Sequence, residues 1–205
     1  MATQHRKTAK NHSSALGQIR IIGGQWRGRK LAVVDQEGLR PTTDRIKETL
    51  FNWLQFELPE ARVLDAFAGT GSLGLEALSR GASEVVFIEK AISASKQLDK
   101  NIKTLLGDIQ NNSDSKPRAE VHNKDTLSHL EQIKGAFDIV FLDPPFHQGL
   151  LEQCIGILAK ESLVSFGSWV YIESEQSLTF STPKNWQLYR EKKAGQVSFR
   201  LFHVQ

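Results

Sequence analysis

The chain has 205 residues and a net charge of +3, a length that suits one main domain of roughly 100 to 200 residues with a small extension. A hydrophobic fraction of 40% and a charged fraction of 24% are typical of a soluble globular protein. No apolar run could span a bilayer and the start of the chain lacks the apolar centre of a signal peptide, so we expect a cytoplasmic protein. A single cysteine, Cys154, excludes an internal disulfide, and the six histidines lack metal-ligand spacing, so we predict no metal site.

Positive charge is concentrated at the N-terminus. Residues 1–30 hold seven of the 26 basic side chains and none of the 23 acidic ones. Such a segment is expected in a protein that binds a polyanion, because Lys and Arg displace the counterions condensed on phosphates. Residues 1–17 are polar and without periodicity, which predicts a disordered basic tail. For this tail alone, a solvated segment without a partner is an equally good interpretation.

A β-hairpin is predicted after the tail. Alternating apolar residues at 19 and 21 and at 31 and 33 flank Gly23-Gly24-Gln25-Trp26-Arg27-Gly28. We interpret Trp26 as exposed between arginines, so that the basic side chains pair with phosphate and the ring stacks on a base. The alternative is a domain-edge hairpin in which Trp26 is simply packed. The RNA-binding residues predicted here are Arg20, Trp26, Arg27 and Arg29.

A helix is predicted next. Arg40-Pro41-Thr42-Thr43-Asp44 is a helix start with a Thr cap and an acid in the first turn. Apolar residues then keep helical spacing from Ile46 to Leu58, until Pro59 stops the helix. Residues 18–59 are therefore expected to form an N-terminal hairpin and helix extension, and residues 60–205 the main domain.

The main domain alternates strands and helices. Strands are predicted at 62–67, 85–88, 120–122, 137–142 and 169–172, and helices at 73–80, 91–106 and near 148–159. Residues 188–193 and 197–204 surround Gly195-Gln196 as an antiparallel hairpin. The fold class is therefore α/β, a doubly wound and mostly parallel Rossmann-like sheet with an antiparallel C-terminal edge hairpin.

A nucleotide site is predicted at the first strand of this domain. Gly69-Thr70-Gly71-Ser72-Leu73-Gly74 follows that strand and opens a helix, and Glu89 ends the next strand, where it can accept two ribose hydroxyls. A glycine turn alone does not distinguish one nucleotide cofactor from another. Asp65, just before the glycines, would repel a pyrophosphate but suits a cationic amino acid moiety, and Asp125 can accept a hydrogen bond from adenine. Three carboxylates around one pocket favour S-adenosylmethionine over a dinucleotide.

The most specific motif is Asp143-Pro144-Pro145-Phe146, directly after the strand predicted at 137–142. Two prolines lack N–H groups and have a fixed φ, so the turn is stiff and leaves carbonyl oxygens free to accept hydrogen bonds. If Asp143 and the Pro144 carbonyl each accept one hydrogen of an exocyclic amino group, its lone pair is aimed at a methyl donor while Phe146 stacks on the ring. Positioning and electrostatics then supply catalysis without a strong base. Adenine, guanine and glutamine all carry such a nitrogen.

These residues, in this order, resemble the amino-methyltransferases with a D/N-P-P-Y/F/W motif. More closely they resemble the RsmD family, bacterial enzymes that make N2-methylguanine in small-subunit ribosomal RNA. The matching stretches are residues 20–30, 40–45 with 50–52, 63–82 and 141–146. The resemblance implies a seven-stranded methyltransferase sheet that acts on 16S ribosomal RNA in the assembled or assembling small subunit. We expect a monomer, since the sequence shows no obvious dimer surface.

The resemblance also implies roles for individual residues. The methionine part of the cofactor would be held by Asp65, Gly69 and Gly71, the ribose by Glu89 and the adenine by Asp125. The guanine would lie against Asp143, Pro144, Pro145 and Phe146. The remaining residues expected near the cofactor are Phe67, Arg40 and Thr42, and Arg45 is expected near the RNA.

Three alternatives stay open. An adenine-N6 methyltransferase of DNA or RNA shares the motif, although DNA enzymes usually need a sizeable target-recognition domain. A protein glutamine methyltransferase commonly opens the motif with asparagine, where this chain has Asp143. A non-catalytic RNA-binding assembly factor with the same fold would bind RNA tightly without methyl transfer.

Overall fold

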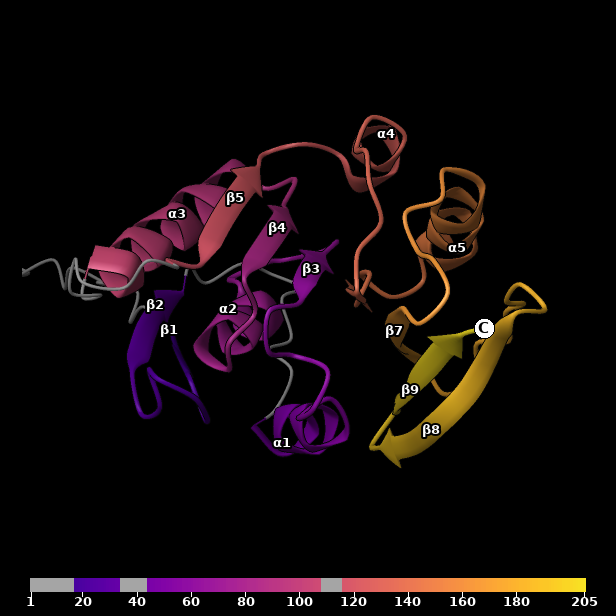
Figure 1. The fold of residues 1–205 in the computed structure, drawn as a ribbon, viewed down its shortest axis with the longest axis horizontal. Coiled ribbons are helices and arrows are strands. Elements are labelled where there is room, and N and C mark those ends of the chain that lie inside the picture. The colour runs from indigo at the N-terminus through magenta and orange to yellow at the C-terminus, as the bar shows by residue number, and fades with distance from the viewer. Residues whose placement is uncertain (1–16, 34–43, 108–115) are drawn as a thin grey trace, which may run out of the picture.

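The computed structural model describes residues 17–33, 44–107 and 116–205. Its centre is a seven-stranded sheet in the order β5-β4-β3-β6-β7-β9-β8 (Figure 1). The strands of this sheet are β3 (Arg62–Asp65), β4 (Glu84–Ile88), β5 (Arg118–His122), β6 (Ile139–Leu142), β7 (Trp169–Glu175), β8 (Trp186–Ala194) and β9 (Val197–Val204).

Strands β3 to β7 are parallel to one another, and β9 and β8 close one side of the sheet as an antiparallel hairpin. Each parallel connection passes over a face of the sheet, which is why the strand segments alternate with helices in the sequence. The predicted fold class, a seven-stranded and mostly parallel sheet with an antiparallel C-terminal edge, is confirmed.

Helices cover both faces of the sheet, and each face has its own apolar core (Figure 1). One core lies under α1 (Asp44–Trp53), α2 (Ser72–Ser79), α3 (Ile92–Gly107) and the N-terminal hairpin. The other lies under α4 (Thr126–Leu130) and α5 (Leu150–Lys160). Successive strand residues point to opposite faces, so Val63 joins the first core and Leu64 the second.

The N-terminal hairpin is a separate two-stranded sheet of β1 (Gly17–Arg20) and β2 (Lys30–Val33). Its turn packs on the end of α2: the Gln25 N–H donates to the Ser79 carbonyl at 2.7 Å, and the Ser79 hydroxyl to the Gly23 carbonyl at 2.6 Å. Gly24 has φ +72°, and a Cβ there would lie 1.8 Å from the Ser79 carbonyl oxygen. Only glycine permits this approach.

The expectation of an exposed Trp26 is wrong. The residue is 6% exposed and belongs to the core between the hairpin and α2, and its backbone N–H donates to the Ser79 hydroxyl at 3.0 Å. The alternative reading of a packed tryptophan in a domain-edge hairpin is the one that holds. Close contact between the turn and α2 buries the ring, so in this fold it cannot stack on a base.

One helix prediction is wrong in its extent, and one short helix was not predicted. The continuous helix α1 ends at Trp53 and does not reach Pro59; a separate turn, closed by the Leu58 N–H on the Leu54 carbonyl, completes the apolar spacing. Such a turn buries both leucines as a helix would, so the spacing alone could not separate the two. The short helix α4 was not predicted, because its five residues hold too little periodicity. The predicted helix start at residues 40–43, and residues 1–16 of the predicted tail, lie outside the described residues, whereas Gly17 begins β1.

Within the described parts of the chain, no helix is long and apolar enough to cross a membrane.

Candidate functional site

The predicted cofactor turn lies at the carboxyl end of β3. Gly69 and Gly71 have φ values of +52° and +84°, which favour glycine. The turn is closed by the Gly71 N–H on the Ala68 carbonyl at 2.6 Å, and a Cβ on Gly71 would lie 2.4 Å from a methyl of Leu98 in α3. Phe67, half-buried, precedes this turn and packs against the second core.

A buried carboxylate lies beneath this turn. Asp65, the last residue of β3, is 2% exposed and accepts a hydrogen bond from the Gly74 N–H at 2.9 Å. Burial, and to a smaller extent the charge of Glu89, raise the pKa of Asp65 to about 7 against the opposing effect of the Gly74 hydrogen bond. A buried anion of this kind is stabilised by a cationic ligand.

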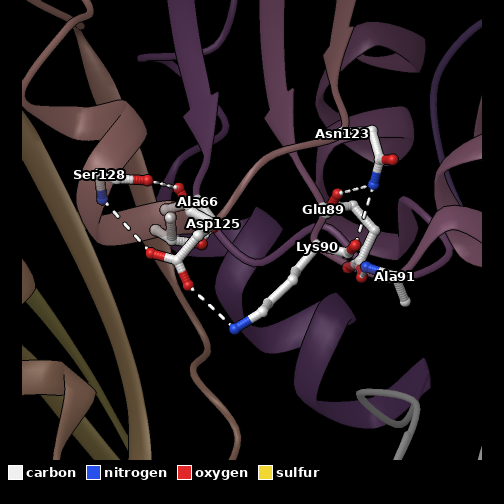
Figure 2. Close-up of polar contacts among 8 residues, drawn as sticks. Ala66, Glu89, Lys90, Ala91, Asn123, Asp125 and Ser128 are labelled. Carbon is white, nitrogen blue, oxygen red and sulfur yellow. Dashed lines mark hydrogen bonds and ion pairs between the residues drawn. The ribbon is translucent and has the colours of Figure 1, made fainter.

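Glu89 ties the ends of β3 and β4 together. One carboxylate oxygen accepts from the Gly69 N–H at 2.7 Å and the other from the Ala91 N–H at 2.6 Å. The Asn123 amide, after β5, donates to the Glu89 and Lys90 carbonyls at 2.8 and 3.0 Å (Figure 2). Each carboxylate oxygen has a second lone pair, so these bonds orient Glu89 and leave it able to accept from a ligand hydroxyl.

Asp125 caps the N-terminus of α4. It accepts from the Ser128 N–H, and its other oxygen pairs with the Lys90 ammonium at 3.2 Å, as Figure 2 shows. The hydrogen bond from Lys90, and then that from Ser128, lower the pKa of Asp125. The ion pair is exposed and weak, so a ligand can displace Lys90 at small cost. The sequence indicated Asp125 but neither Lys90 nor Asn123, because neither residue belongs to a recognisable motif.

The Asp143-Pro144-Pro145-Phe146 motif begins where β6 ends. β6 is the neighbour of β3, and the Ala66 N–H donates to the Phe141 carbonyl at 3.1 Å. The glycine turn and the motif therefore leave adjacent strands, which are about 4.8 Å apart. Asp143 and Phe146 are half-buried, Pro144 is buried and Pro145 is exposed.

Glu175, at the end of β7, holds the far end of the motif. His147 has φ +61°, a conformation that is rare outside glycine. Its N–H donates to a Glu175 carboxylate oxygen at 2.5 Å, and its Nδ1 lies 3.1 Å from the same oxygen. The motif is thus held at its start by β6 and, just after its end, by the contact of His147 with Glu175 of β7.

A groove of about 350 Å³ lies beside the motif. Its walls are Pro144 and Pro145, the start of α5 and the end of β7, and its acidic residues are Glu152, Glu173 and Glu175. The groove is large enough for a flat ring, and its lining combines these three carboxylates with the apolar side chains of Leu150, Leu151 and Leu178. It suits an uncharged or cationic group that donates hydrogen bonds, and it disfavours a phosphate.

Next to Asp143 the sheet carries a buried Tyr171–Glu173 pair. The Tyr171 hydroxyl donates to Glu173 at 2.9 Å. Burial and the neighbouring charges of Glu173 and Asp143 raise the pKa of Tyr171 well above its usual value, so the phenol stays protonated. Since Leu142 pairs with Ile172, Asp143 and Glu173 follow side by side. This pair could not be predicted from the sequence, because a Tyr-x-Glu spacing is common in strands.

Comparison with known proteins shows the family to which this chain belongs. The family model described as "Conserved hypothetical protein 95" matches residues 19–203. Ribosomal RNA small subunit methyltransferase D of Escherichia coli K12 is 50% identical over 193 residues, which cover 94% of this chain and 92% of that protein. The protein of the same name from Haemophilus influenzae is 48% identical, over 92% of this chain and 95% of its own. The chain belongs to the RsmD family. The resemblance inferred from the motifs is confirmed.

A solved structure also resembles this RsmD-family chain. It is a putative methyltransferase, yhhF, from Escherichia coli, with a TM-score of 0.80 and 47% identity, covering 92% of this chain and 99% of that one. This chain is therefore a member of a methyltransferase family and has the corresponding sheet. Its glycine turn and its Asp143 motif lie at one edge of that sheet.

The RsmD-family fold separates some predicted RNA-binding residues from this edge. Arg27 and Arg29 are exposed on the turn that packs on Ser79, at the far end of α2. α2 starts at the glycine turn and has eight residues, so its end lies about 12 Å away along the helix. Arg20 pairs with Asp44 at the start of α1, beside the exposed Arg45, while Arg40 and Thr42 lie outside the described residues.

Proposed function

We propose that this protein transfers a methyl group from S-adenosylmethionine to the exocyclic N2 of a guanine in 16S ribosomal RNA. The observation that carries the proposal is the adjacency of the glycine turn after β3 and the Asp143 motif after β6, beside a groove that contains three glutamates. The names of the relatives support ribosomal RNA of the small subunit as the substrate. The guanine comes from the family resemblance, since the motif itself accepts any planar amino nitrogen.

The residues at the β3 and β4 ends fit this cofactor. The Ser72 hydroxyl, at the first position of α2, is buried and has no hydrogen-bond partner among the described residues, as expected beside a ligand. Asp65 offers an anion to the ammonium and sulfonium, and Glu89 offers acceptors to the ribose hydroxyls. When bound, the cofactor supplies a methyl group activated by its positive sulfur.

The chain's own residues orient the guanine. Asp143 and the Pro144 carbonyl accept the two hydrogens of the amino group, which directs the nitrogen lone pair toward the methyl group. Phe146 stacks on the ring, and the His147–Glu175 contacts fix the end of the turn. The motif is held before the substrate arrives, so little free energy is spent on ordering it. The amino proton leaves during or after transfer, and no strong base is needed.

We expect the protein to act in the cytoplasm, as a monomer that meets the small ribosomal subunit or its assembly intermediate. The test is a labelling experiment with radioactive S-adenosylmethionine. The acceptors are small subunits from a strain that lacks the enzyme, naked ribosomal RNA, duplex DNA and a release factor. We expect label in the small subunit and its recovery as N2-methylguanine after digestion. N6-methyladenine would support the adenine alternative, labelled protein the glutamine alternative, and RNA binding without label the assembly-factor alternative.

Glu89→Ala is expected to weaken cofactor binding by at least about tenfold, because two hydrogen bonds from ribose hydroxyls to a charged group are lost. Isothermal titration calorimetry measures the change. The matched control is Glu84→Ala, at the opposite end of the same strand, which removes only a partly exposed pair with Arg62. Equal affinities of the Glu89→Ala protein and the wild type would show that Glu89 has only a structural role.

Cofactor affinity is expected to fall as the pH drops below about 7. The pKa of Asp65 in the free protein is about 7, and a cationic ligand favours the ionised carboxylate, so binding releases a proton at lower pH. The affinity should drop by up to about tenfold per pH unit between pH 7 and 5 and stay level above pH 8. Asp65→Asn should bind more weakly at pH 8 and lose this pH dependence. A wild-type affinity that is flat from pH 5 to 8 would contradict the contact.

The same pKa predicts the direction of a stability change in the free protein. The folded-state pKa of Asp65 is raised above the usual 3.8, so the folded state holds the proton more tightly than the unfolded state does. The contribution of Asp65 to stability is therefore full below about pH 4 and is lost as the pH rises through 7.

A further inference from the structure

The end of the C-terminal hairpin lies at the same edge of the sheet as the candidate site. β8 is parallel to β7, since both are antiparallel to β9. The turn between β8 and β9 is fastened to the end of β7, with the Gln176 N–H donating to the Gln196 carbonyl at 2.9 Å and the Gln176 amide to Gly195. The carboxyl end of β8 therefore lies at the same edge of the sheet as Glu173, Glu175 and the groove.

The position of this hairpin relative to the motif follows from the strand register. Leu142 of β6 pairs with Ile172 of β7, so the next residues, Asp143 and Glu173, lie level with each other. Glu173 in turn pairs with Phe199 of β9, and Phe199 pairs with Lys192 of β8. Neighbouring strands are about 4.8 Å apart, so the backbone of Lys192 lies about 14 Å from that of Asp143. Residues paired across strands point to one face, which places the Lys192 side chain on the face of Tyr171 and Glu173. Lys193 pairs with Ser198 and therefore points to the opposite face at the same strand end.

The outer strand carries unbalanced positive charge. Every residue of β8 after Trp186 is exposed. Residues 184–196 contain four basic side chains and one acid, Glu191. The Glu191 carboxylate forms an ion pair with the Arg200 guanidinium, with 2.7 Å between Oε1 and Nε. No carboxylate of the described residues lies within ion-pair distance of Lys192 or Lys193. The two ammonium groups are therefore available to an external anion.

A second copy of the chain is a poor occupant of this edge. The register shifts between Leu188 and Arg190, which leaves Tyr189 as a bulge on the outer strand. The Arg190 guanidinium lies over the Tyr189 ring at 4.7 Å, and the ring packs on Trp169 at 5.0 Å. A bulge and a row of cations oppose the addition of another strand.

We propose that Lys192 and Lys193 bind the phosphate backbone of the RNA that flanks the target nucleotide. The inference rests on the proposed function, since the RNA is the methyl acceptor. The acidic groove beside the motif repels phosphate, so the backbone of a bound strand must leave the base site toward positive charge. The β8 end supplies that charge about three strands from Asp143, on the edge shared with the motif. Arg27 and Arg29 lie at the other end of α2.

The test compares two charge-removal variants for binding to naked 16S ribosomal RNA at several salt concentrations. The first is Lys192→Gln with Lys193→Gln. The matched control is Lys96→Gln with Lys100→Gln, two exposed lysines one turn apart on α3. This helix lies beside β4 and β5, at the opposite end of the strand order from β8 (Figure 1). Both variants lose two charges from exposed positions, so thermal melting should show both folded.

The variant with Lys192→Gln and Lys193→Gln, called the hairpin variant, should lose roughly tenfold or more in RNA affinity at 0.1 M salt. The slope of log K against log salt concentration should become shallower by about 1.4 to 1.8. Its cofactor affinity should stay unchanged, and methylation of small subunits should fall through a higher KM. The proposal would be overturned if the protein with Lys192→Gln and Lys193→Gln bound the RNA as tightly as the wild type does, or if the α3 control lost as much affinity. Binding is measured without methyl transfer, so a wild-type protein that binds RNA but labels no guanine would count against the proposed function alone.

Discussion

Asp143→Ala is expected to reduce methyl transfer by at least about 100-fold in kcat, while cofactor affinity stays within a few fold. The loss follows from the role of the carboxylate, because without it one hydrogen of the amino group has no acceptor and the nitrogen lone pair is no longer held toward the methyl group. Removal of one such preorganised electrostatic contact typically costs two to three orders of magnitude. Single-turnover labelling of small subunits measures the chemical step, and calorimetry measures cofactor binding.

Two further variants sharpen this test. Asp143→Asn keeps one acceptor oxygen and should retain part of the activity, as the D/N alternation of the motif class implies. Asp138→Ala, just before the start of the same strand, removes an exposed carboxylate that accepts a hydrogen bond from the Arg62 N–H, and it should leave transfer intact. Loss of cofactor binding in Asp143→Ala would show that Asp143 belongs to the cofactor site and not to the amine site.

Glu76→Ala is expected to lower the free energy of unfolding by about 3 to 5 kcal/mol, the cost of removing one partner of a buried ion pair. Glu76 in α2 is fully buried, and its two oxygens accept from the Ile22 N–H at 2.8 Å and the Arg80 guanidinium at 2.7 Å. The buried Lys47 ammonium of α1 is nearby: burial lowers the pKa of Lys47, and the charge of Glu76 opposes that shift. One carboxylate thus joins the hairpin to α2, and its charge acts on the buried Lys47 of α1.

Urea denaturation at pH 7 measures the change, with a fall in Tm of roughly 10 °C as a second readout. The matched control is Asp99→Ala, which removes the carboxylate of another i, i+4 ion pair, with Lys103 in α3. That pair is exposed and its loss should cost less than about 1 kcal/mol. Similar losses in the two variants would contradict the role given to Glu76.

The amino-acid pattern was sufficient for most of the fold. Strands β3, β4 and β6 are buried along almost their whole length and appear as short apolar runs, each followed by a helix, so their positions along the chain and their parallel arrangement could be predicted without tertiary information. The C-terminal hairpin was equally clear, since Gly195-Gln196 separates two alternating segments. Helix ends were less predictable: Leu54 and Leu58 are buried whether the chain continues as a helix past Trp53 or forms a turn.

The candidate site divides in the same way. Asp65, the glycine turn, Glu89 and the Asp143 motif are recognisable because the chemistry fixes both residue type and position after a strand. The other residues of the site were not recognisable, because each acts through a contact with a residue 2 to 35 positions away that is part of no short motif. These residues are Asn123, Lys90, Glu175 and the Tyr171–Glu173 pair. Their roles could be seen only in the folded chain.

By itself the sequence determined the fold class, the family and the edge of the sheet at which the chemistry is expected, because these depend on local patterns of apolar residues, glycines and prolines. The tertiary structure decided where charge and aromatic surface lie relative to that edge. It buried Trp26 against Ser79, placed Arg27 and Arg29 at the far end of α2, and brought Lys192 level with Asp143. Strand order sets these distances, and strand order comes from long-range packing that no short segment contains.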